Sequence, residues 1–250
     1  MTAQQDLTGR TAVITGGSSG LGRATALALA KAGADVAVLA RGSTELDDTA
    51  ALVRSEGRRA AAVIVDLADA GAVERAAAQV LDELGGIDVL VNAAGTDVPG
   101  PVAYLDVESW NRVLDVNLRA SFLLARAAWP HMVATGSGTI INISSVAGRR
   151  GWANASAYCA AKFGLTGFTQ ALAAEGKPHG IRACVVFPGA MDSNWGVWSP
   201  QDRGSQAPTV PEDALAPERV ADLLVWMATA PPGVVLNEVT VTPLQEQGWP

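Results

Sequence analysis

A tyrosine and a lysine lie four positions apart in the alanine-rich stretch Ser156-Ala157-Tyr158-Cys159-Ala160-Ala161-Lys162. The stretch contains neither proline nor glycine, so it predicts a helix, and residues with this spacing share one helix face. A cation about 4 Å from a phenol, at an effective dielectric of about 20, favours the phenolate by roughly 4 kcal/mol before desolvation. Tyr158 and Lys162 therefore form a candidate general acid/base pair; the alternative is an incidental pair on an exposed helix.

A strand, a glycine-rich turn and a helix follow one another near the N-terminus. Residues 11–15 form a β-branched run, residues 23–32 are rich in alanine and leucine, and between them lies Gly16-Gly17-Ser18-Ser19-Gly20-Leu21-Gly22. Glycines let a backbone approach a pyrophosphate closely, and a helix N-terminus offers free N–H groups and a partial positive charge. The spacing differs from the usual G-x-G-x-x-G, but the context predicts a nucleotide-binding turn.

The second predicted strand, residues 35–40, completes a βαβ unit and is followed by a basic residue. An acidic residue at this strand end would bond an adenosine ribose and repel a 2′-phosphate. Here Ala40 and Arg41 occupy the position. A guanidinium would favour NADP(H) over NAD(H) through a charge-assisted contact, and an arginine that is merely solvated is the alternative.

Apolar strands and helices alternate through the rest of the chain. Further strands are predicted at residues 60–65, 87–91, 139–143, 181–187 and 234–241, and helices at 44–57, 72–84 and 107–129. This order predicts an α/β fold, a Rossmann-type doubly wound parallel sheet covered by helices on both faces. We expect residues 1–250 to form one domain. The irregular stretch 188–217, with Trp195 and Trp198, is predicted to be a substrate loop.

Charge and composition argue against several classes of partner. The net charge of −7 and a pI near 4.8 disfavour nucleic acid and anionic membranes. No targeting segment and no apolar stretch of membrane-spanning length is found, so we expect a soluble, cytoplasmic protein. The two cysteines, Cys159 and Cys184, do not form a Cys-x-x-Cys motif, and we expect neither a disulfide framework nor a metal site.

Polar residues follow several of the predicted strands. In open parallel sheets, ligands bind beyond the carboxyl ends of the strands. The glycine turn, Asp66, the turn at Asn92 and Ser145 all occur there. Ser145 precedes Tyr158 by thirteen residues (158 − 145 = 13), so the strand end and the following helix can bring its hydroxyl towards the phenol. The two side chains form a plausible carbonyl-binding pair.

With these motifs in order, nearly the whole chain resembles the short-chain dehydrogenase/reductase family. Thr15-Gly16 with Gly20 and Gly22 matches the family's cofactor loop, and Asn92-Ala93-Ala94-Gly95 matches its Asn-Asn-Ala-Gly turn except at Ala93. The family's catalytic tetrad falls on Asn117, Ser145, Tyr158 and Lys162. The segment that holds the nicotinamide amide falls on Pro188-Gly189 with Ser193.

The resemblance implies a role for each member of the tetrad. Tyr158 would donate a proton to the substrate oxygen as hydride arrives, and Ser145 would hydrogen-bond that oxygen. Lys162 would bind the nicotinamide ribose and lower the tyrosine pKa. Asn117 would hold a water that links Lys162 to solvent, or would simply bond backbone within a helix. Cofactor contacts are implied for Gly16, Ser18, Ser19, Gly20, Leu21, Arg41, Asp66, Leu67, Asn92, Ala94, Tyr158, Lys162, Pro188, Gly189, Met191 and Ser193.

The function implied is an oxidoreductase that interconverts a ketone and a secondary alcohol, with NADP(H) favoured and NAD(H) possible. Trp152, Val146, Ala147 and the loop 191–198 would line the pocket for an apolar or aromatic small molecule. We expect a homodimer or homotetramer; the small-residue face formed by Ala160, Ala161 and Gly164 would allow close packing across a dimer, or would be buried within the chain.

Two alternatives use the same fold. Epimerases or dehydratases of nucleotide sugars share the Tyr and Lys, but they usually have an additional substrate domain for which this chain offers little length. A catalytically weak sensor or partner protein would bind the cofactor without turnover. Such proteins typically lack the Tyr or the Lys, and both are present here.

Overall fold

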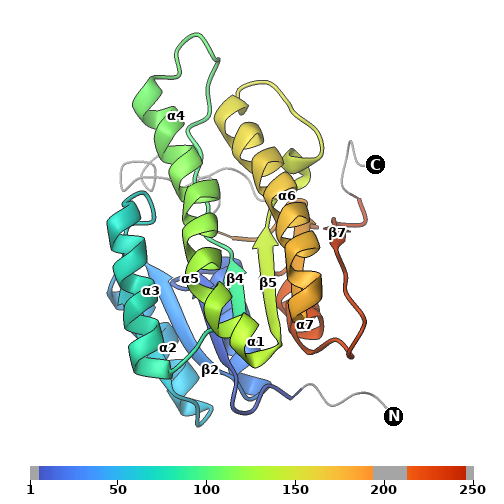
Figure 1. The fold of residues 1–250 in the computed structure, drawn as a ribbon. Helices are drawn as coiled ribbons and strands as arrows, with labels where there is room; N and C mark the ends of the chain where they lie inside the picture. Colours follow the sequence, from blue (N-terminus) through green and yellow to red (C-terminus); the bar gives the residue numbers. More distant parts are fainter. Residues whose placement is uncertain (1–5, 194–212, 246–250) are drawn as a thin grey trace.

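A single parallel sheet forms the centre of the computed structural model, which describes residues 6–193 and 213–245 (Figure 1). Its seven strands lie in the order β3-β2-β1-β4-β5-β6-β7, so the direction of winding reverses between β1 and β4. This confirms the predicted Rossmann-type doubly wound sheet. The strands are β1 (Thr11–Thr15), β2 (Asp35–Ala40), β3 (Ala60–Ile64), β4 (Val89–Asn92), β5 (Gly138–Ile143), β6 (Ile181–Pro188) and β7 (Glu238–Val241).

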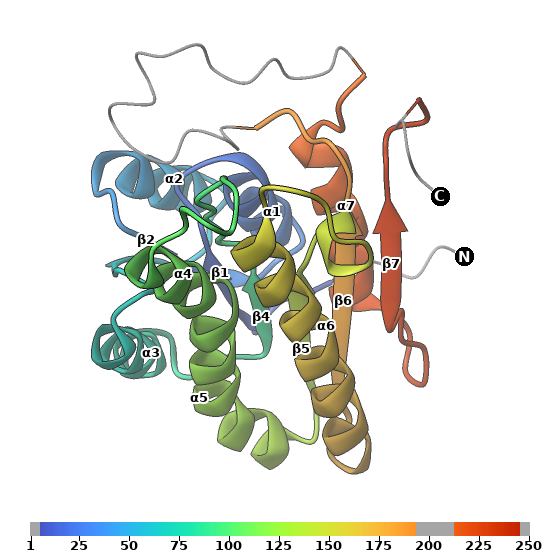
Figure 2. The same cartoon turned by 90° about the horizontal axis from the view of Figure 1, so that it is seen from above.

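Helices cover both faces of the sheet (Figure 2). They are α1 (Gly20–Lys31), α2 (Thr44–Ser55), α3 (Ala70–Leu84), α4 (Val107–Leu114), α5 (Ala120–Thr135), α6 (Ser156–Gly176) and α7 (Pro217–Thr229). Helices α1, α2 and α7 lie on one side, and α3, α5 and α6 on the other. Successive side chains of β1 enter opposite cores: Ala12 and Ile14 pack under the first group, and Val13 packs under the second. Both faces are therefore apolar, which explains why the strands are continuous apolar runs.

The predicted helix at 107–129 differs from the structure in one informative way. Helix α4 ends at Leu114, a π-helical segment spans Asp115–Arg119, and α5 continues past Pro130 to Thr135. A π-helical turn inserts one extra residue and so changes the direction of the side chains within it. Asn117 lies in this turn.

The C-terminal part of the chain also differs from the prediction. The last strand begins at Glu238 rather than at 234, because Val234 N–H bonds the carbonyl oxygen of Pro231 at 3.0 Å and closes a turn there. Helix α7, which was not predicted, begins with the last residue of the irregular stretch, Pro217. Trp195 and Trp198 lie outside the described residues.

The small-residue face of α6 is partly covered within the chain: Ala161 is buried, and Ala160 and Gly164 are half-buried. Ala161 is fully buried in a cluster with Val113 and Ala157. A Cβ atom at Gly164 would lie 2.9 Å from the Leu118 side chain, so this helix position has no room for a larger residue. Packing across a dimer and burial within the chain both stay predictions for this face.

A row of side-chain hydrogen bonds joins the carboxyl ends of β1, β4 and β5 to α6. Thr15, Asn92 and Asn142 lie side by side in register across the three strands. The amide nitrogen of Asn92 donates to Asn142 Oδ1, and that of Asn142 donates to Thr169 Oγ1, both at 2.8 Å. Thr15 Oγ1 accepts from the backbone N–H of Ala94 at 3.0 Å. This row fixes the strand ends from which the polar residues extend.

Replacing the central amide of this row should destabilise the fold. Asn142→Leu leaves the buried amide nitrogen of Asn92 without its acceptor and removes the donor to Thr169 Oγ1, and we expect a loss of about 2–4 kcal/mol in the free energy of unfolding. The same substitution at the exposed Asn111 should stay within about 0.5 kcal/mol of wild type. Urea denaturation measures both, and equal effects would contradict the structural role of the row.

Candidate functional site

Asn117 anchors the loop that follows β4. Its side chain is buried, and its amide nitrogen donates to the carbonyl oxygens of Val113 and Thr96, both at 2.8 Å. Its Oδ1 accepts from the N–H of Thr96 at 3.2 Å. The two bonds to Thr96 pair its backbone N–H and its backbone carbonyl, as the bonds to a neighbouring strand would. Of the two roles expected for Asn117, backbone bonding is therefore the one the geometry displays.

Tyr158 and Lys162 lie on one face of α6, as predicted. Tyr158 is in the first turn, and Lys162 Nζ lies 5.4 Å from the centre of its ring. Tyr158 is 6% exposed and Lys162 is 3% exposed. Lys162 Nζ donates to the carbonyl oxygen of Ile143, at the end of β5, at 2.8 Å. The side chains thus meet between the start of α6 and the end of β5.

Ser145 lies next to this pair. It caps the short turn Val146–Gly148, and its Oγ accepts from the N–H of Ala147 at 3.1 Å. A side-chain hydrogen bond from Ser145 to Tyr158 lowers the pKa of the phenol. The structure therefore brings Ser145 and Tyr158 together, and places Asn117 in the adjoining turn before α5.

Burial determines the pKa values of the pair. Desolvation raises the pKa of Tyr158 well above its ordinary value of 10.0; the Ser145 hydrogen bond opposes this shift, and the charge of Asp97 adds to it. Desolvation lowers the pKa of Lys162 from 10.5 to about 7. The net shift of the tyrosine pKa is therefore upward, opposite to the shift expected from a facing ammonium, because burial disfavours both charged forms. At neutral pH the phenol holds its proton.

Three glycines of the turn, Gly16, Gly17 and Gly22, are packed so closely that no side chain fits at their positions. Gly16 has a φ of +73°, and a Cβ there would lie 3.1 Å from the backbone of Ala94. A Cβ at Gly17 would lie 2.6 Å from a side chain of β2, and one at Gly22 would lie 2.2 Å from the carbonyl oxygen of Gly16. Helix α1 begins at Gly20, so its first N–H groups face this cradle. A turn of this shape fits the pyrophosphate of a dinucleotide.

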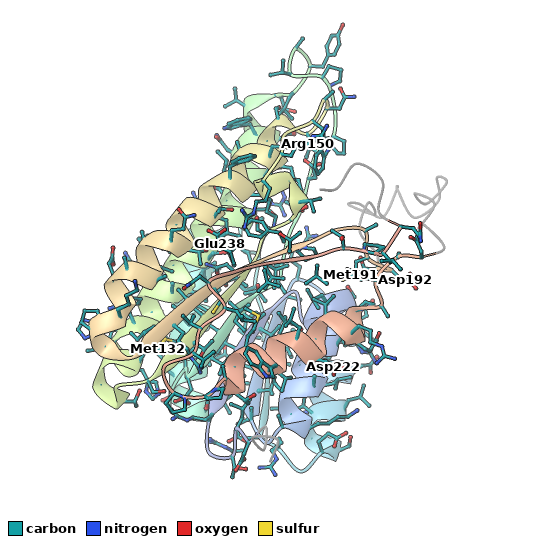
Figure 3. All side chains as sticks on the ribbon, turned by 90° about the vertical axis from the view of Figure 1, so that its right-hand side faces the viewer. Met132, Arg150, Met191, Asp192, Asp222 and Glu238 are labelled. Carbon is teal, nitrogen blue, oxygen red and sulfur yellow. The ribbon has the colours of Figure 1, made fainter. Side chains whose placement is uncertain are left out.

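The segment after β6 lies over the same turn. Gly189 N–H donates to the carbonyl oxygen of Val241 at 2.8 Å, and Met191 forms a bridge with Leu215. Figure 3 shows Met191 and Asp192 beside the segment that leads into α7. A Cβ at Gly20 would lie 3.3 Å from Ser193 Cβ. Ser193 therefore approaches the glycine cradle.

Other predicted cofactor residues surround the turn. Ser18 and Ser19 are half-buried, and Leu21 is buried. The amide nitrogen of Asn92 bonds Asn142, while its Oδ1 is buried and has no hydrogen-bond partner within the described part of the chain. Asn92 thus belongs to the row of side-chain hydrogen bonds across the sheet, and its Oδ1 has no partner in the described residues.

Arg41 and Asp66 lie at the edge of the sheet where an adenosine would be expected. Arg41 is exposed directly after β2. Partial burial acts to raise the pKa of Asp66, but the hydrogen bonds from Ala68 N–H and Arg112 and the charges of Arg112 and Arg41 hold it below its usual value. Leu67 is buried beside it. Arg41 is therefore close enough to Asp66 for their charges to interact.

Two residues near the candidate site were not predicted from the sequence. Arg112 of α4 forms an ion pair with Asp66 at 3.3 Å, and nothing in the local pattern marks it. Asp97 lies two residues beyond the turn Asn92-Ala93-Ala94-Gly95 and is buried. Its position after a parallel strand was a usable signal, because polar side chains at such strand ends face ligands.

Neither a metal cluster nor a membrane helix is found in the described ranges. Within residues 6–193 and 213–245, no three His, Cys, Asp or Glu side chains are placed to hold a metal ion. No helix in the same residues is long and apolar enough to cross a membrane.

Comparisons with known proteins agree on one family. Residues 10–203 match the family model described as short chain dehydrogenase. The cis-4-hydroxycyclohexanecarboxylate dehydrogenase of Sinomonas cyclohexanicum is 38% identical over 92% of this chain and 93% of its own length. The 3-oxoacyl-[acyl-carrier-protein] reductase of Synechocystis sp. is 36% identical over 94% of this chain and 95% of its own length.

A solved structure shows the same fold. A metagenomic short-chain oxidoreductase crystallised in complex with NADP matches with a TM-score of 0.82 and 34% identity, over 95% of this chain and 98% of its own. The family model spans strands β1 to β6, the glycine turn and the helix with Tyr158 and Lys162. The chain therefore belongs to the short-chain dehydrogenase family and is an oxidoreductase.

Proposed function

We propose that this chain interconverts a ketone and a secondary alcohol by hydride transfer, with Tyr158 as the general acid/base. The observation that supports this most strongly is the buried pair Tyr158 and Lys162 between α6 and β5, with the half-buried Ser145 hydrogen-bonded to the phenol. A bound nicotinamide would supply or accept the hydride. The side chains of the chain supply the proton and hold the substrate oxygen.

Tyr158 is suited to act as the acid. Because its pKa is raised, the phenol is protonated throughout the neutral range and can donate to the oxygen of a ketone. Ser145, already bonded to the phenol, would stabilise the charge that develops on that oxygen. In the oxidative direction the phenol must first lose its proton, so we expect alcohol oxidation to become faster as the pH rises.

Lys162 would bind the nicotinamide ribose. An ammonium has three donors, and one of them is used by the carbonyl oxygen of Ile143. The remaining two could reach ribose hydroxyls. Asn117 would not contact the substrate. It would position the loop that borders the site through its two hydrogen bonds to Thr96.

The cofactor would lie along the carboxyl edge of the sheet, with NADP(H) preferred. The glycine cradle at residues 16–22 would take the pyrophosphate, and the adenosine would lie near Asp66 and Leu67. Residues 188–193, with Pro188, Gly189, Met191 and Ser193, would cover the nicotinamide. Arg41 is exposed where a 2′-phosphate would lie, and the similar metagenomic enzyme was crystallised with NADP.

The substrate would be a small molecule whose reacting carbon bears a hydroxyl or keto group. The two relatives named above act, by their names, on a cyclic hydroxy acid and on a 3-oxoacyl thioester, which share that group. Trp152 is half exposed and Val146 is half-buried, so both can border a pocket. Ala147 cannot, because it is fully buried against Tyr158 and Cys159; its predicted place in the pocket wall was wrong.

Removing the phenolic hydroxyl should abolish most turnover and spare cofactor binding. For Tyr158→Phe we expect kcat for ketone reduction to fall by about 10²- to 10⁴-fold, because general acid catalysis supplies that much. A panel of aliphatic, aromatic, 3-oxoacyl and sugar carbonyls with NADPH measures kcat, and NADPH fluorescence measures binding. Undiminished turnover in the variant would contradict the proposal. A wild type that binds NADPH tightly and reduces nothing would favour the sensor alternative.

Arg41 should account for the cofactor preference. Arg41→Ala removes a charge-assisted contact, so kcat/KM for NADPH should fall by about 10- to 100-fold while the value for NADH changes little. Arg75→Ala, at an exposed arginine of α3, is the matched control and should change neither value. Steady-state kinetics with both cofactors tests this. Equal losses for NADPH and NADH would show that Arg41 does not recognise the 2′-phosphate.

The burial of Lys162 should cost stability at low pH. Its pKa is about 7 in the fold and 10.5 in the unfolded chain, so between these values only the unfolded chain binds the proton and stability rises with pH. Below pH 7 both states are protonated and the full cost is present. Lys162→Met should therefore melt above wild type at pH 6, with the difference shrinking by at least about 3 °C at pH 9.

Thermal melts of the two proteins without cofactor measure this difference. Lys31→Met, at an exposed lysine at the end of α1, is the control and should show no such trend. A difference between Lys162→Met and wild type that grows with pH would contradict the lowered pKa.

A further inference from the structure

The turn that follows Ser145 begins where β5 leaves the sheet. Ser144 N–H donates to the carbonyl oxygen of Val186 in β6 at 2.7 Å, directly before Ser145. The chain then turns back on itself, and Gly148 N–H donates to the carbonyl oxygen of Ser145 at 2.8 Å. These local bonds give the turn its shape. Its position over the sheet depends on contacts with other elements.

Helix α6 supports one side of this turn. A Cβ atom at Gly148 would lie 2.3 Å from Ser144 Oγ and 3.0 Å from the carbonyl oxygen of Lys162, so the turn and the helix are in close contact there. Close packing of this kind resists movement of the turn towards the helix. A contact of another kind must resist movement away from it.

Arg149, the residue directly after the turn, makes such a contact. Its side chain forms an ion pair with Glu238, the first residue of β7. The guanidinium also lies over the ring of Phe187 in β6, 4.2 Å from the ring centre, and Phe187 is fully buried. Arg149 therefore joins the end of the serine turn to the last two strands of the sheet.

The ion pair between Arg149 and Glu238 has support that most surface pairs lack. Exposed ion pairs contribute little, because two mobile side chains must be held in one geometry. Here the two side chains are 36% and 29% exposed. Glu238 Oε1 accepts from Gln170 Nε2 of α6 at 2.8 Å, which fixes the carboxylate. The planar guanidinium is oriented by the aromatic ring beneath it. These contacts together hold Arg149 in one orientation.

We propose that Arg149 is a positioning residue for Ser145. By binding Glu238 and packing on Phe187, it holds the turn Val146–Gly148 in place and so keeps the serine hydroxyl where the substrate oxygen would bind. This inference rests on the proposed function and adds to it a residue that acts through Ser145. Arg149 itself takes no part in proton or hydride transfer.

Removing the guanidinium should slow hydride transfer and spare cofactor binding. Arg149→Met keeps an unbranched stem over Phe187 and removes the charge. We expect the single-turnover rate of carbonyl reduction by NADPH to fall about tenfold, because a group like Ser145 contributes about 10²- to 10³-fold and would be displaced but still present. The dissociation constant for NADPH, measured by fluorescence, should stay within about twofold of wild type.

A matched arginine and a second variant of the pair are the controls. Arg126 of α5 likewise pairs with a carboxylate, that of Glu74, and lies over a ring, that of Phe122. Arg126→Met should therefore leave the single-turnover rate unchanged. Glu238→Gln keeps the size of the side chain and weakens the bond to Arg149, so we expect the rate to fall about threefold.

A double-mutant cycle tests whether Arg149 acts through Ser145. Ser145→Ala removes the hydroxyl and should slow reduction by about 10²-fold or more. With no hydroxyl left to position, the addition of Arg149→Met should slow the reaction by less than about twofold more. If the two losses multiply instead, Arg149 acts independently of Ser145 and the inference is overturned.

Thermal melts show whether each variant is folded. If Arg149→Met does not fold, Glu238→Gln takes its place in the cycle with Ser145→Ala. An unchanged rate in either folded variant, or an equal loss in Arg126→Met, would overturn the inference while the proposed function stands. If wild type reduces no compound of the carbonyl panel with NADPH or NADH, both fail.

Discussion

The removal of Tyr158 and Lys162 from water is the constraint on which the site depends, because it disfavours the charged form of each side chain. Other interactions must therefore stabilise the packing of α6 against the sheet. Three hydrogen bonds join α6 to β5 and the residue after it: Lys162 Nζ to the carbonyl of Ile143, Ser144 Oγ to the carbonyl of Lys162, and the Asn142 amide to Thr169. Polar bonds along one strand therefore offset the cost of the buried pair.

A second set of contacts makes the opposite wall of the site. There the π-helical turn between α4 and α5 places Asn117 against Thr96, so a side-chain amide bonds a loop as a neighbouring strand would. Because Asp97 follows Thr96 directly, the same contact that fixes the loop also fixes the carboxylate. Regular sheet register holds β5, whereas side-chain hydrogen bonds from Asn117 and Thr15 hold the loop after β4.

The sequence predicted what depends on local pattern. Runs such as Thr139-Ile140-Ile141 are apolar on both faces and indicate buried parallel strands, and the four-residue spacing of Tyr158 and Lys162 defines one helix face. It did not predict the π-helical turn, because the turn is stabilised by a bond between Asn117 and a residue 21 positions away. The sign of the tyrosine pKa shift was wrong for a related reason: spacing gives the distance between two groups but not their burial.

Burial shifts the two pKa values in opposite directions, and the charge of Asp97 adds to the shift of Tyr158. The pair therefore favours a neutral phenol beside an amine that is half protonated near pH 7, so the resting site is prepared to donate a proton and not to accept one. Hydrogen bonds to Lys162 from ribose hydroxyls would favour its charged form, and only then would a phenolate gain from a facing ammonium. In the proposed reaction, proton acceptance by Tyr158 would thus depend on what Lys162 binds, whereas proton donation would follow from the burial of the phenol alone.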